Sequence, residues 1–346
     1  MAKKYENQII AGDCVEILGK AQEPFADLIF ADPPFNIGYK YDKYHDRHKK
    51  EHYINWTMQW MTACCNVLKP NGSFYIAIGD DYAAYVKMIA EDELKLFCRN
   101  WIIWHYTFGQ QMKNKFARSH THILYFVKDK KQFTFNDNVL RVISDRQKIY
   151  NDKRANPEGK MPDDVWNEYP RLCGTFEERT GWHPCQMPES ILARIIRAST
   201  HEGDWILDPF NGSGTTTVVA HKLLRRYTGI DISKKYVTEA RKRIKNSSLA
   251  VEGEGKLAWT EGLDNELKWF YHENKITTED LMAKEELLGI FTYKFNERME
   301  KVFTPEDITK RLVYLRKSGK LGPLGYSRKQ KNEKEISLWK SGVTQK

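Results

Sequence analysis

The residue pattern with the clearest chemical meaning is a glycine-containing turn from Asp208 to Thr216, which reads DPFNGSGTT. It lies between a predicted strand and a predicted helix, where glycines let backbone N–H groups face a ligand at the helix N-terminus. Asp231 ends the next predicted strand, 23 residues after Asp208, where a carboxylate can accept hydrogen bonds from ribose hydroxyls. Because the sequence has no G-x-G-x-x-G segment, the pattern argues against a dinucleotide ligand.

A second pattern, Asp32-Pro33-Pro34-Phe35, follows another predicted buried strand. The two prolines remove backbone donors and stiffen the turn, so its carbonyls are expected to be free to accept hydrogen bonds. A carboxylate and a carbonyl can accept both hydrogens of an amino group, and Phe35 can stack on a base. Taken alone, such a tetrapeptide more often only ends a strand and packs its phenylalanine, so the rest of the chain must decide between the two interpretations.

Elements that could bring these two patterns together follow from the hydrophobic periodicity. Short apolar runs predict strands over residues 8–13, 27–35, 72–80, 100–106, 121–128, 204–210 and 226–232. Helical spacing predicts helices over residues 51–68, 188–200, 214–224 and 233–244. This alternation indicates an α/β fold with a mostly parallel sheet covered on both faces. Ligands gather at the carboxyl ends of such strands, so we expect the two patterns to meet there.

The remaining segments are less regular. Periodicity is poor over residues 128–182, residues 246–262 have the composition of a linker, and the chain beyond them is predicted to be helical. The last 46 residues contain 12 Lys and Arg against 4 Asp and Glu, which accounts for most of the net charge of +9. A basic end of this kind is typical either of a solvated tail or of a nucleic-acid contact.

The cysteines and the apolar runs bear on the cellular compartment. The six cysteines have neither paired nor metal-ligand spacing. No apolar run has the length of a signal peptide or of a membrane span. These features predict a cytoplasmic protein with no metal site and no membrane partner.

Together, the two patterns resemble the amino-methyltransferases of DNA, in which DPPF is similar to the catalytic segment and DPFNGSGTT to the cofactor segment. DPPF precedes DPFNGSGTT by 176 residues, which resembles the permuted β-class arrangement of these enzymes. Three further segments occur in the order of that class: GDC at 12–14, HPCQMPE at 183–189 and GID at 229–231. The resemblance covers about residues 7–245, and its specificity comes from five separated segments that agree in order.

The resemblance implies a fold and a domain organisation. It implies the Rossmann-like class I fold of S-adenosylmethionine-dependent methyltransferases, with a mixed, mostly parallel seven-stranded sheet and helices on both faces. Residues 1–250 would form the permuted catalytic domain, with residues 128–182 as the candidate target-recognition region. Residues 256–346 would form a small, mainly helical, basic C-terminal domain that binds DNA.

Residue roles are implied only where this sequence matches the family's segments. The implied catalytic residues, which would receive a flipped base, are Asp32, Pro33, Pro34 and Phe35. The residues implied to bind S-adenosyl-L-methionine are Asp13, Asp32, His183, Gln186, Pro188, Asp208, Phe210, Asn211, Gly212, Ser213, Gly214, Thr215, Thr216 and Asp231. The sequence departs from the family at Met187, where many members have a lysine. The implied chemistry is direct in-line methyl transfer without a covalent enzyme intermediate or a metal.

Double-stranded DNA is the implied partner, and basic and aromatic residues outside the five segments are candidates for contacting it. These candidates are Lys40, Tyr41, Lys43, Arg47, Lys113, Lys115, Arg118, Arg316, Lys317, Lys320, Arg328 and Lys329. The span 128–182 adds cations whose alternative role is simply to face water. A homodimer and a cognate restriction endonuclease are further expectations from the resemblance.

The identity of the methylated base rests on one residue. DPPF resembles the N6-adenine type, whereas enzymes that methylate N4 of cytosine usually resemble SPPY, so adenine is favoured over cytosine by Asp32. RNA enzymes tend to have NPPY and are a more distant alternative. A DNA-binding regulator on a decayed methyltransferase scaffold is the alternative from another class, and the intact Asp32, Gly212, Gly214 and Asp231 argue against it.

Overall fold

The computed structural model describes residues 2–110, 113–150, 152–174, 178–247, 259–299, 301, 303–322 and 324. These residues form one sheet of eight strands in the order β1-β8-β7-β2-β3-β5-β4-β6. The strands are β1 (Gln8–Ala11), β2 (Ala26–Ala31), β3 (Leu68–Ile78), β4 (Phe97–Gln110), β5 (Arg118–Val127), β6 (Val165–Trp166), β7 (Trp205–Asp208) and β8 (Arg226–Asp231). Pairing is parallel from β1 through β3 and between β4 and β6, and antiparallel on both sides of β5.

The sheet has one strand more than the seven that the resemblance implies. The additional strand is β6, which consists of Val165 and Trp166 and pairs with Ile103 and Trp104 at the edge of the sheet. Two residues are too few to produce an alternating pattern, so the sequence could not reveal this strand within the irregular span 128–182.

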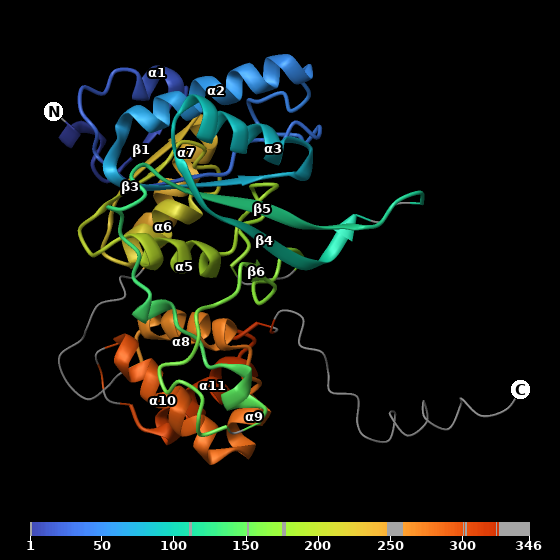
Figure 1. The fold of residues 1–346 in the computed structure, drawn as a ribbon, viewed down its shortest axis with the longest axis vertical. Coiled ribbons are helices and arrows are strands. Elements are labelled where there is room, and N and C mark those ends of the chain that lie inside the picture. Colours follow the sequence, from blue (N-terminus) through green and yellow to red (C-terminus); the bar gives the residue numbers. More distant parts are fainter. Residues whose placement is uncertain are drawn as a thin grey trace, which may run out of the picture.

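Helices cover both faces of the sheet, as the alternation of elements predicts (Figure 1). One face packs against α1 (Cys14–Leu18), α2 (Lys50–Val67) and α3 (Asp80–Met88), and the other against α5 (Glu189–Ser199), α6 (Thr215–Lys222) and α7 (Lys234–Lys245). The period-2 alternation of a strand explains this division, because Leu28 and Phe30 of β2 enter one core and Ile29 and Ala31 the other. Short helical turns η1 (Ala2–Tyr5) and η2 (Ile89–Glu93) complete this part of the molecule.

The order in which strands are added to the sheet changes direction between β2 and β7. From β2 the chain continues to β3 on one side, and from β7 it continues to β8 on the other. The two strands are parallel neighbours, with Leu28 opposite Ile206 and Ile29 opposite Leu207. Their carboxyl ends therefore lie side by side at a topological switch point, which is the usual ligand-binding position in open α/β sheets.

A second group of helices follows the sheet domain and has its own apolar core. It contains α8 (Glu261–Asn274), α9 (Thr278–Ala283), α10 (Glu285–Met299) and α11 (Pro305–Lys317), with Phe270, Phe291, Phe295 and Phe303 in its centre. Ile143, between η3 (Asn138–Leu140) and α4 (Asp145–Lys148), also enters this core. Of the predicted linker 246–262, residues 248–258 lie outside the described ranges, and Glu261 and Gly262 already belong to α8.

The helical group lies next to α5, with α8 facing it (Figure 1), and a buried ion pair joins the two parts. Arg197 of α5 pairs with Glu266 of α8, and its guanidinium lies 5.1 Å from the ring centroid of Trp269. Within the helical group, Arg298 of α10 pairs with Glu273 of α8, with an Nη1–Oε2 distance of 2.5 Å, and its Nε lies 3.6 Å from Glu266. The helical group is thus fixed to the catalytic-type domain by contacts that bury charge, rather than attached only through a linker.

The positive charge expected of the C-terminal region is unevenly distributed. Residues 259–324 contain 11 Lys and Arg and 12 Asp and Glu, so the helical group is close to neutral. The basic excess lies in α11 and after it, and residues 325–346 are outside the described ranges. None of the helices in the described ranges is long and apolar enough to cross a membrane.

Candidate active site

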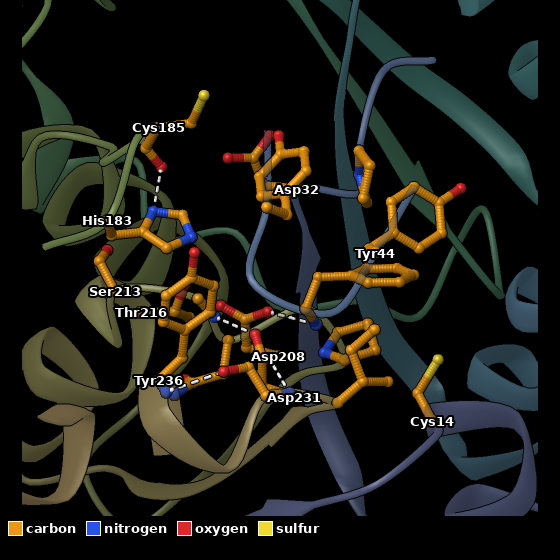
Figure 2. A pocket seen from close by; sticks show the side chains of 18 of the residues that line it. Cys14, Asp32, Tyr44, His183, Cys185, Asp208, Ser213, Thr216, Asp231 and Tyr236 are labelled. Carbon is orange, nitrogen blue, oxygen red and sulfur yellow. Dashed lines mark hydrogen bonds between the residues drawn. The ribbon is translucent and has the colours of Figure 1, made fainter. Parts of the chain in front are cut away.

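The two sequence patterns meet in one pocket at the switch point between β2 and β7 (Figure 2). We call this the first pocket. Asp32 follows β2, Asp208 ends β7, and both line the pocket. Asp13 from the end of β1 and Asp231 from the end of β8 line it as well. Four carboxylates that are far apart in the sequence are therefore gathered by the parallel order of their strands.

The turn after β7 has the conformation that its glycines make possible. Gly212 has a φ of +44° and Gly214 a φ of +78°, so both occupy the left-handed region that favours glycine. A Cβ atom on Gly212 would stand 2.8 Å from Nε2 of His183. The Gly212 N–H donates to Asp231 Oδ2 at 2.9 Å, which ties the turn to the end of β8. Gly214 is the N-cap of α6, so the turn leads directly into a helix N-terminus.

The side chains of this turn are divided between the pocket and the support of the backbone. Phe210, Asn211, Ser213, Thr215 and Thr216 line the first pocket. Asn211 Oδ1 accepts from the Thr217 hydroxyl at 3.0 Å, while its buried Nδ2 has no hydrogen-bond partner within the described structure. Asn211 therefore supports the backbone of the turn through Thr217 of α6.

The electrostatics of the first pocket favour a cationic ligand. Burial, together with the neighbouring Asp208 carboxylate, raises the pKa of Asp32 to about 8. Burial also raises the pKa of Asp208 to about 7 and raises that of Asp231 above its ordinary value. Lys43 is the lysine among the lining residues, so the carboxylates outnumber nearby cations. A positively charged ligand would stabilise the ionised carboxylates and lower their pKa values.

The Asp32–Phe35 turn faces two spaces. Asp32 and Pro34 line the first pocket, and Phe35 lines a second pocket that adjoins it. The Pro34 carbonyl accepts a hydrogen bond from the Tyr53 hydroxyl of α2 at 2.6 Å. The expectation that the carbonyls of this turn are free is therefore wrong for Pro34, because a buried tyrosine from a distant helix uses that acceptor.

The second pocket lies between the loop after Phe35 and strands β4 and β5. It is lined by Trp104 and Tyr106 of β4, by residues 118, 120 and 121 of β5, and by Arg171. Asp32, Tyr41, Cys185 and Met187 line both pockets and so form the boundary between them. The carboxylate of Asp32 can therefore contact one molecule in each space at the same time.

The loop from Asn36 to His48 is organised by one buried carboxylate. Asp46 accepts hydrogen bonds from the backbone N–H groups of Asn36, Ile37 and Tyr39 at 2.7, 3.2 and 2.9 Å. Farther along the loop, Asp42 Oδ2 accepts from the Ser233 hydroxyl at 2.6 Å. The loop is thus folded on itself and fastened across the first pocket to the start of α7.

The segment from His183 to Pro188 also lies at the boundary between the pockets. The His183 ring lies 4.8 Å from that of Tyr236, and its Nδ1 is 2.9 Å from the Cys185 carbonyl. Burial lowers the pKa of His183 to about 4, so the ring is neutral near pH 7. Gln186 lines the second pocket, and its Nε2 donates to the Glu178 carbonyl at 2.8 Å. Pro188 is the N-cap of α5. Neither Gln186 nor Pro188 belongs to the described lining of the first pocket.

The predicted DNA-contact residues are found in three places. Lys40, Tyr41 and Lys43 lie on the pocket walls, and Arg47 is exposed on the same loop. Lys113 and Lys115 are exposed at the tip of the β4–β5 hairpin, whereas Arg118 lines the second pocket and pairs with Asp80 and Asp81. Arg316 and Lys317 lie at the end of α11, and Lys320 follows the helix. None of the three belongs to the described lining of either pocket, and Arg316 pairs with Glu279. Arg328 and Lys329 lie outside the described residues.

Several residues of the site were not singled out by their sequence pattern. Trp56 of α2 and Tyr236 of α7 line the first pocket, although their helical spacing marks them only as core positions. Arg243 of α7 donates to the Ser213 carbonyl at 3.1 Å, to Thr215 Oγ1 at 3.0 Å and to Glu189 at 2.8 Å. A cation in the last turn of a helix is common, so no sequence signal marks Arg243 as a support of the turn after β7.

Arg171 is one of four residues of the irregular span that line the second pocket, together with Leu172, Cys173 and Arg179. Its guanidinium lies 5.4 Å from the Tyr106 ring centroid, and its Nη2 is 3.3 Å from the Tyr39 hydroxyl. In contrast, Arg146 and Arg154 both pair with Asp152. Both arginines are therefore neutralised by an aspartate of the same candidate target-recognition region, residues 128–182.

Comparison with known proteins places these features in a family. The DNA methylase family model for N6 and N4 methyltransferases matches residues 26–242. The type II methyltransferase M.HpaI of Haemophilus parainfluenzae is 33% identical over 308 residues, which are 85% of this chain and 94% of that protein. The DNA adenine methyltransferase YhdJ of Escherichia coli is 36% identical over 245 residues, which are 68% of this chain and 82% of that protein.

Solved structures share the fold at lower sequence identity. The cytosine-N4-specific PvuII DNA methyltransferase superposes with a TM-score of 0.52 at 17% identity, covering 83% of this chain and 92% of that one. The M1.HpyAVI–SAM complex superposes with a TM-score of 0.50 at 24% identity, covering 68% of this chain and 98% of that one. The family match spans both sequence patterns and most of the residues that line the pocket in which they meet, and this chain therefore belongs to the family of N6/N4 DNA methylases.

Proposed function

We propose that this protein transfers a methyl group to N6 of adenine in double-stranded DNA after the base has been flipped out of the duplex. The observation that carries the proposal is the position of Asp32 on the boundary between the two pockets. One pocket contains the turn after β7, and the other contains Phe35 and opens toward the hairpin and Arg171. A donor in the first pocket and a base in the second would both contact Asp32.

S-adenosylmethionine is the methyl donor of this enzyme, and the residues of the first pocket fit it. The molecule carries a sulfonium and an ammonium cation besides one carboxylate, which suits a pocket where Asp32 and Asp208 have raised pKa values. Asp231, on the wall of this pocket, can accept hydrogen bonds from its ribose hydroxyls. When bound, it supplies an electrophilic methyl group.

Asp32 would activate the amino group by accepting one of its hydrogens. The lone pair of an exocyclic amino nitrogen is delocalised into the ring, so the nitrogen is a poor nucleophile. The ionised Asp32 carboxylate and the Pro33 carbonyl would each accept a hydrogen and direct the lone pair away from the ring. Holding the reactants in such a near-attack geometry is worth about 7–11 kcal/mol. Asp32, with a pKa of about 8, can also hold the proton that the nitrogen releases after transfer.

Adenine is favoured over cytosine by the first residue of the DPPF segment and by the relative YhdJ, which is named a DNA adenine methyltransferase. The chemistry is the same for N4 of cytosine, and the PvuII enzyme shows that the fold also serves that base. Cytosine N4 is therefore the second candidate.

The DNA duplex would lie over the second pocket, because cations and aromatic side chains border it. Lys40, Tyr41 and Arg171 on its walls suit phosphates and unstacked bases. The six free cysteines of the chain suit a reducing compartment such as the cytoplasm. A homodimer and a cognate restriction endonuclease stay predictions, which sedimentation and copurification would test.

The decisive experiment combines the full-length protein, S-adenosylmethionine and unmethylated genomic DNA, followed by single-molecule sequencing of the product. We expect N6-methyladenine at one short recognition sequence. N4-methylcytosine at such a sequence would instead establish the second candidate. The control is Asp32→Ala, which we expect to abolish transfer while cofactor binding is weakened but retained, because Asp13, Asp208 and Asp231 stay in the pocket. Methylation by Asp32→Ala, or binding of the cofactor by the wild type without methylation of any DNA, would refute the proposal.

A further inference from the structure

The β4–β5 hairpin extends away from the body of the molecule (Figure 1), and its tip lies beyond the pair of Gln110 and Arg118. Phe116, at this tip, is 99% exposed. Single exposed apolar side chains are common on protein surfaces, so exposure alone assigns no role to Phe116. Its position and its neighbours must decide whether it has one.

The neighbours of Phe116 at the tip are cationic. Lys113 and Lys115 are both exposed, and the described ranges contain no acidic partner for either of them. Arg118 follows two residues later and is held by Asp80 and Asp81 at 3.0 and 3.3 Å. A phenylalanine flanked by two unpaired lysines complements a polyanion with apolar groups inside it, such as a nucleic acid. A second copy of this tip would instead bring like charges together.

The base of the same hairpin forms a wall of the second pocket. Arg118, His120 and Thr121 of β5 line this pocket together with Phe35 and Asp32. Phe116 and His120 are four positions apart in the chain, so their Cα atoms lie within about 14 Å of each other even if the chain is fully extended. Since a duplex rises about 3.4 Å per base pair, the tip reaches within about four base pairs of the pocket.

We propose that the hairpin tip enters the duplex and places Phe116 in the base stack next to the flipped nucleotide, while Lys113 and Lys115 contact the flanking phosphates. This inference rests on the proposed function. Extruding a base removes its stacking with both neighbours, and an aromatic ring inserted into the gap restores part of that contact. The second pocket then holds the base outside the helix, and Phe116 keeps the opened site from closing.

The test compares duplex DNA with the same DNA after heat denaturation, using tritiated S-adenosylmethionine and full-length variants. We expect Phe116→Ala to lower methylation of duplex DNA by about tenfold or more, which is the scale of one lost base–aromatic stack. Methylation of the denatured strands should change less than about twofold, since no stack needs to be opened. Phe116→Trp should retain duplex activity, because its ring also stacks.

The matched control is Phe97→Ala, at the opposite end of β4, where the side chain is 41% exposed. It should leave the ratio of duplex to single-strand activity unchanged. Equal loss on both substrates, no loss on duplex, or conversion of a wild-type dimer to a monomer by Phe116→Ala would each overturn the proposal.

A binding measurement separates this inference from the proposed function. By fluorescence anisotropy, we expect Phe116→Ala to lose affinity for a fully paired duplex but not for a duplex with an unpaired bubble. Wild-type protein that methylates no DNA would defeat the proposed function, while the two binding affinities would still decide the role of Phe116. Equal loss of affinity for both duplexes would overturn that role.

Discussion

Asp32 and Asp208 are two carboxylates that share one pocket, and their proximity determines how the pocket responds to pH. Each is protonated more readily than an ordinary aspartate, because burial disfavours its charged form and Asp208 repels the charge of Asp32. The protonated forms cannot attract the cationic groups of the cofactor. We therefore expect binding of S-adenosylmethionine to be coupled to the loss of protons from this pair.

We predict that affinity for S-adenosylmethionine rises several-fold between pH 6 and pH 9. The pKa values of about 7 for Asp208 and about 8 for Asp32 lie within this interval, so both groups become ionised across it. Isothermal titration calorimetry in the absence of DNA measures the effect. Asp208→Asn should bind more weakly and show a smaller pH dependence. An affinity that is constant from pH 6 to pH 9 would contradict the coupling.

The raised pKa of Asp32 also predicts a conflict between activity and stability. Between the unfolded value of 3.8 and the folded value of about 8, the folded protein holds a proton that the unfolded chain releases. The contribution of Asp32 to the free energy of unfolding therefore falls as pH rises through this window and levels off above it. The slope is smaller than about 1.4 kcal/mol per pH unit, which is the limit for one proton.

Asp32→Asn should accordingly raise the melting temperature relative to the wild type, by an amount that grows from pH 4 to pH 8 and then stays constant. Differential scanning calorimetry at several pH values provides the measurement. Asp27→Asn is the control, because Asp27 accepts from Lys69 at 2.8 Å and its loss removes a favourable contact. A lower melting temperature of Asp32→Asn than of the wild type at pH 8 would show that the ionised Asp32 carboxylate does not destabilise the folded protein.

At the scale of elements, the loop 36–48 depends on Asp46. Its carboxylate accepts from three backbone N–H groups, and its side chain is 2% exposed. Hydrogen bonds to a charged group contribute about 1.5–3 kcal/mol each, so the loop conformation is defined mainly by this residue. Because Tyr41 and Lys43 stand on the same loop, the walls of both pockets depend on it.

Asp46→Ala should release the loop, lower duplex methylation by about tenfold or more, and leave the sheet intact. Hydrogen exchange followed by mass spectrometry should show faster exchange in residues 36–48, with β2 and β7 protected as in the wild type. Glu51→Ala, an exposed change at the start of α2, should leave both activity and exchange unchanged. Unaltered exchange in the loop of Asp46→Ala would show that other contacts define it.

At the scale of the whole molecule, the C-terminal helices act as a structural part of the enzyme. Glu266 of α8 lies between Arg197 and Arg298, and all three side chains are at most 10% exposed. Removing one partner of a buried ion pair typically costs about 3–5 kcal/mol, because the remaining charge stays buried. Deleting the whole helical group would leave Arg197 of α5 without Glu266 and would remove Trp269 from the apolar core of the sheet domain.

We predict that Glu266→Ala lowers the free energy of unfolding by about 3 kcal/mol or more, as measured by urea denaturation at pH 7. Glu285→Ala, at the exposed start of α10, should change it by less than about 0.5 kcal/mol. Removing only residues 325–346, where the basic excess is concentrated, should leave stability unchanged and reduce the salt dependence of DNA binding. A Glu266→Ala variant as stable as the wild type would mean that the helical group is attached independently of this contact.

The sequence by itself determined most of the elements around the site, and it predicted the chemistry of the site. Aspartates and glycines placed directly after apolar runs indicated two strand-end turns, and the structure brings Asp32 and Asp208 together at adjacent strands. This was predictable because the patterns are local: a strand, its turn and the following helix lie within a few residues of one another. The helices around Trp60 and Ile195 were predictable for the same reason, since each buries one periodic face.

Only the tertiary structure decided which distant residues complete the site. Tyr53 uses the Pro34 carbonyl, Arg243 supports the turn after β7, and Tyr41 stands between the two pockets. Periodicity reports that a side chain is buried but not what it contacts, because partners far apart in the chain are selected by packing. The attachment of α8 through Glu266 has the same origin, since an acidic residue on a helix carries no local sign of the arginine that it meets.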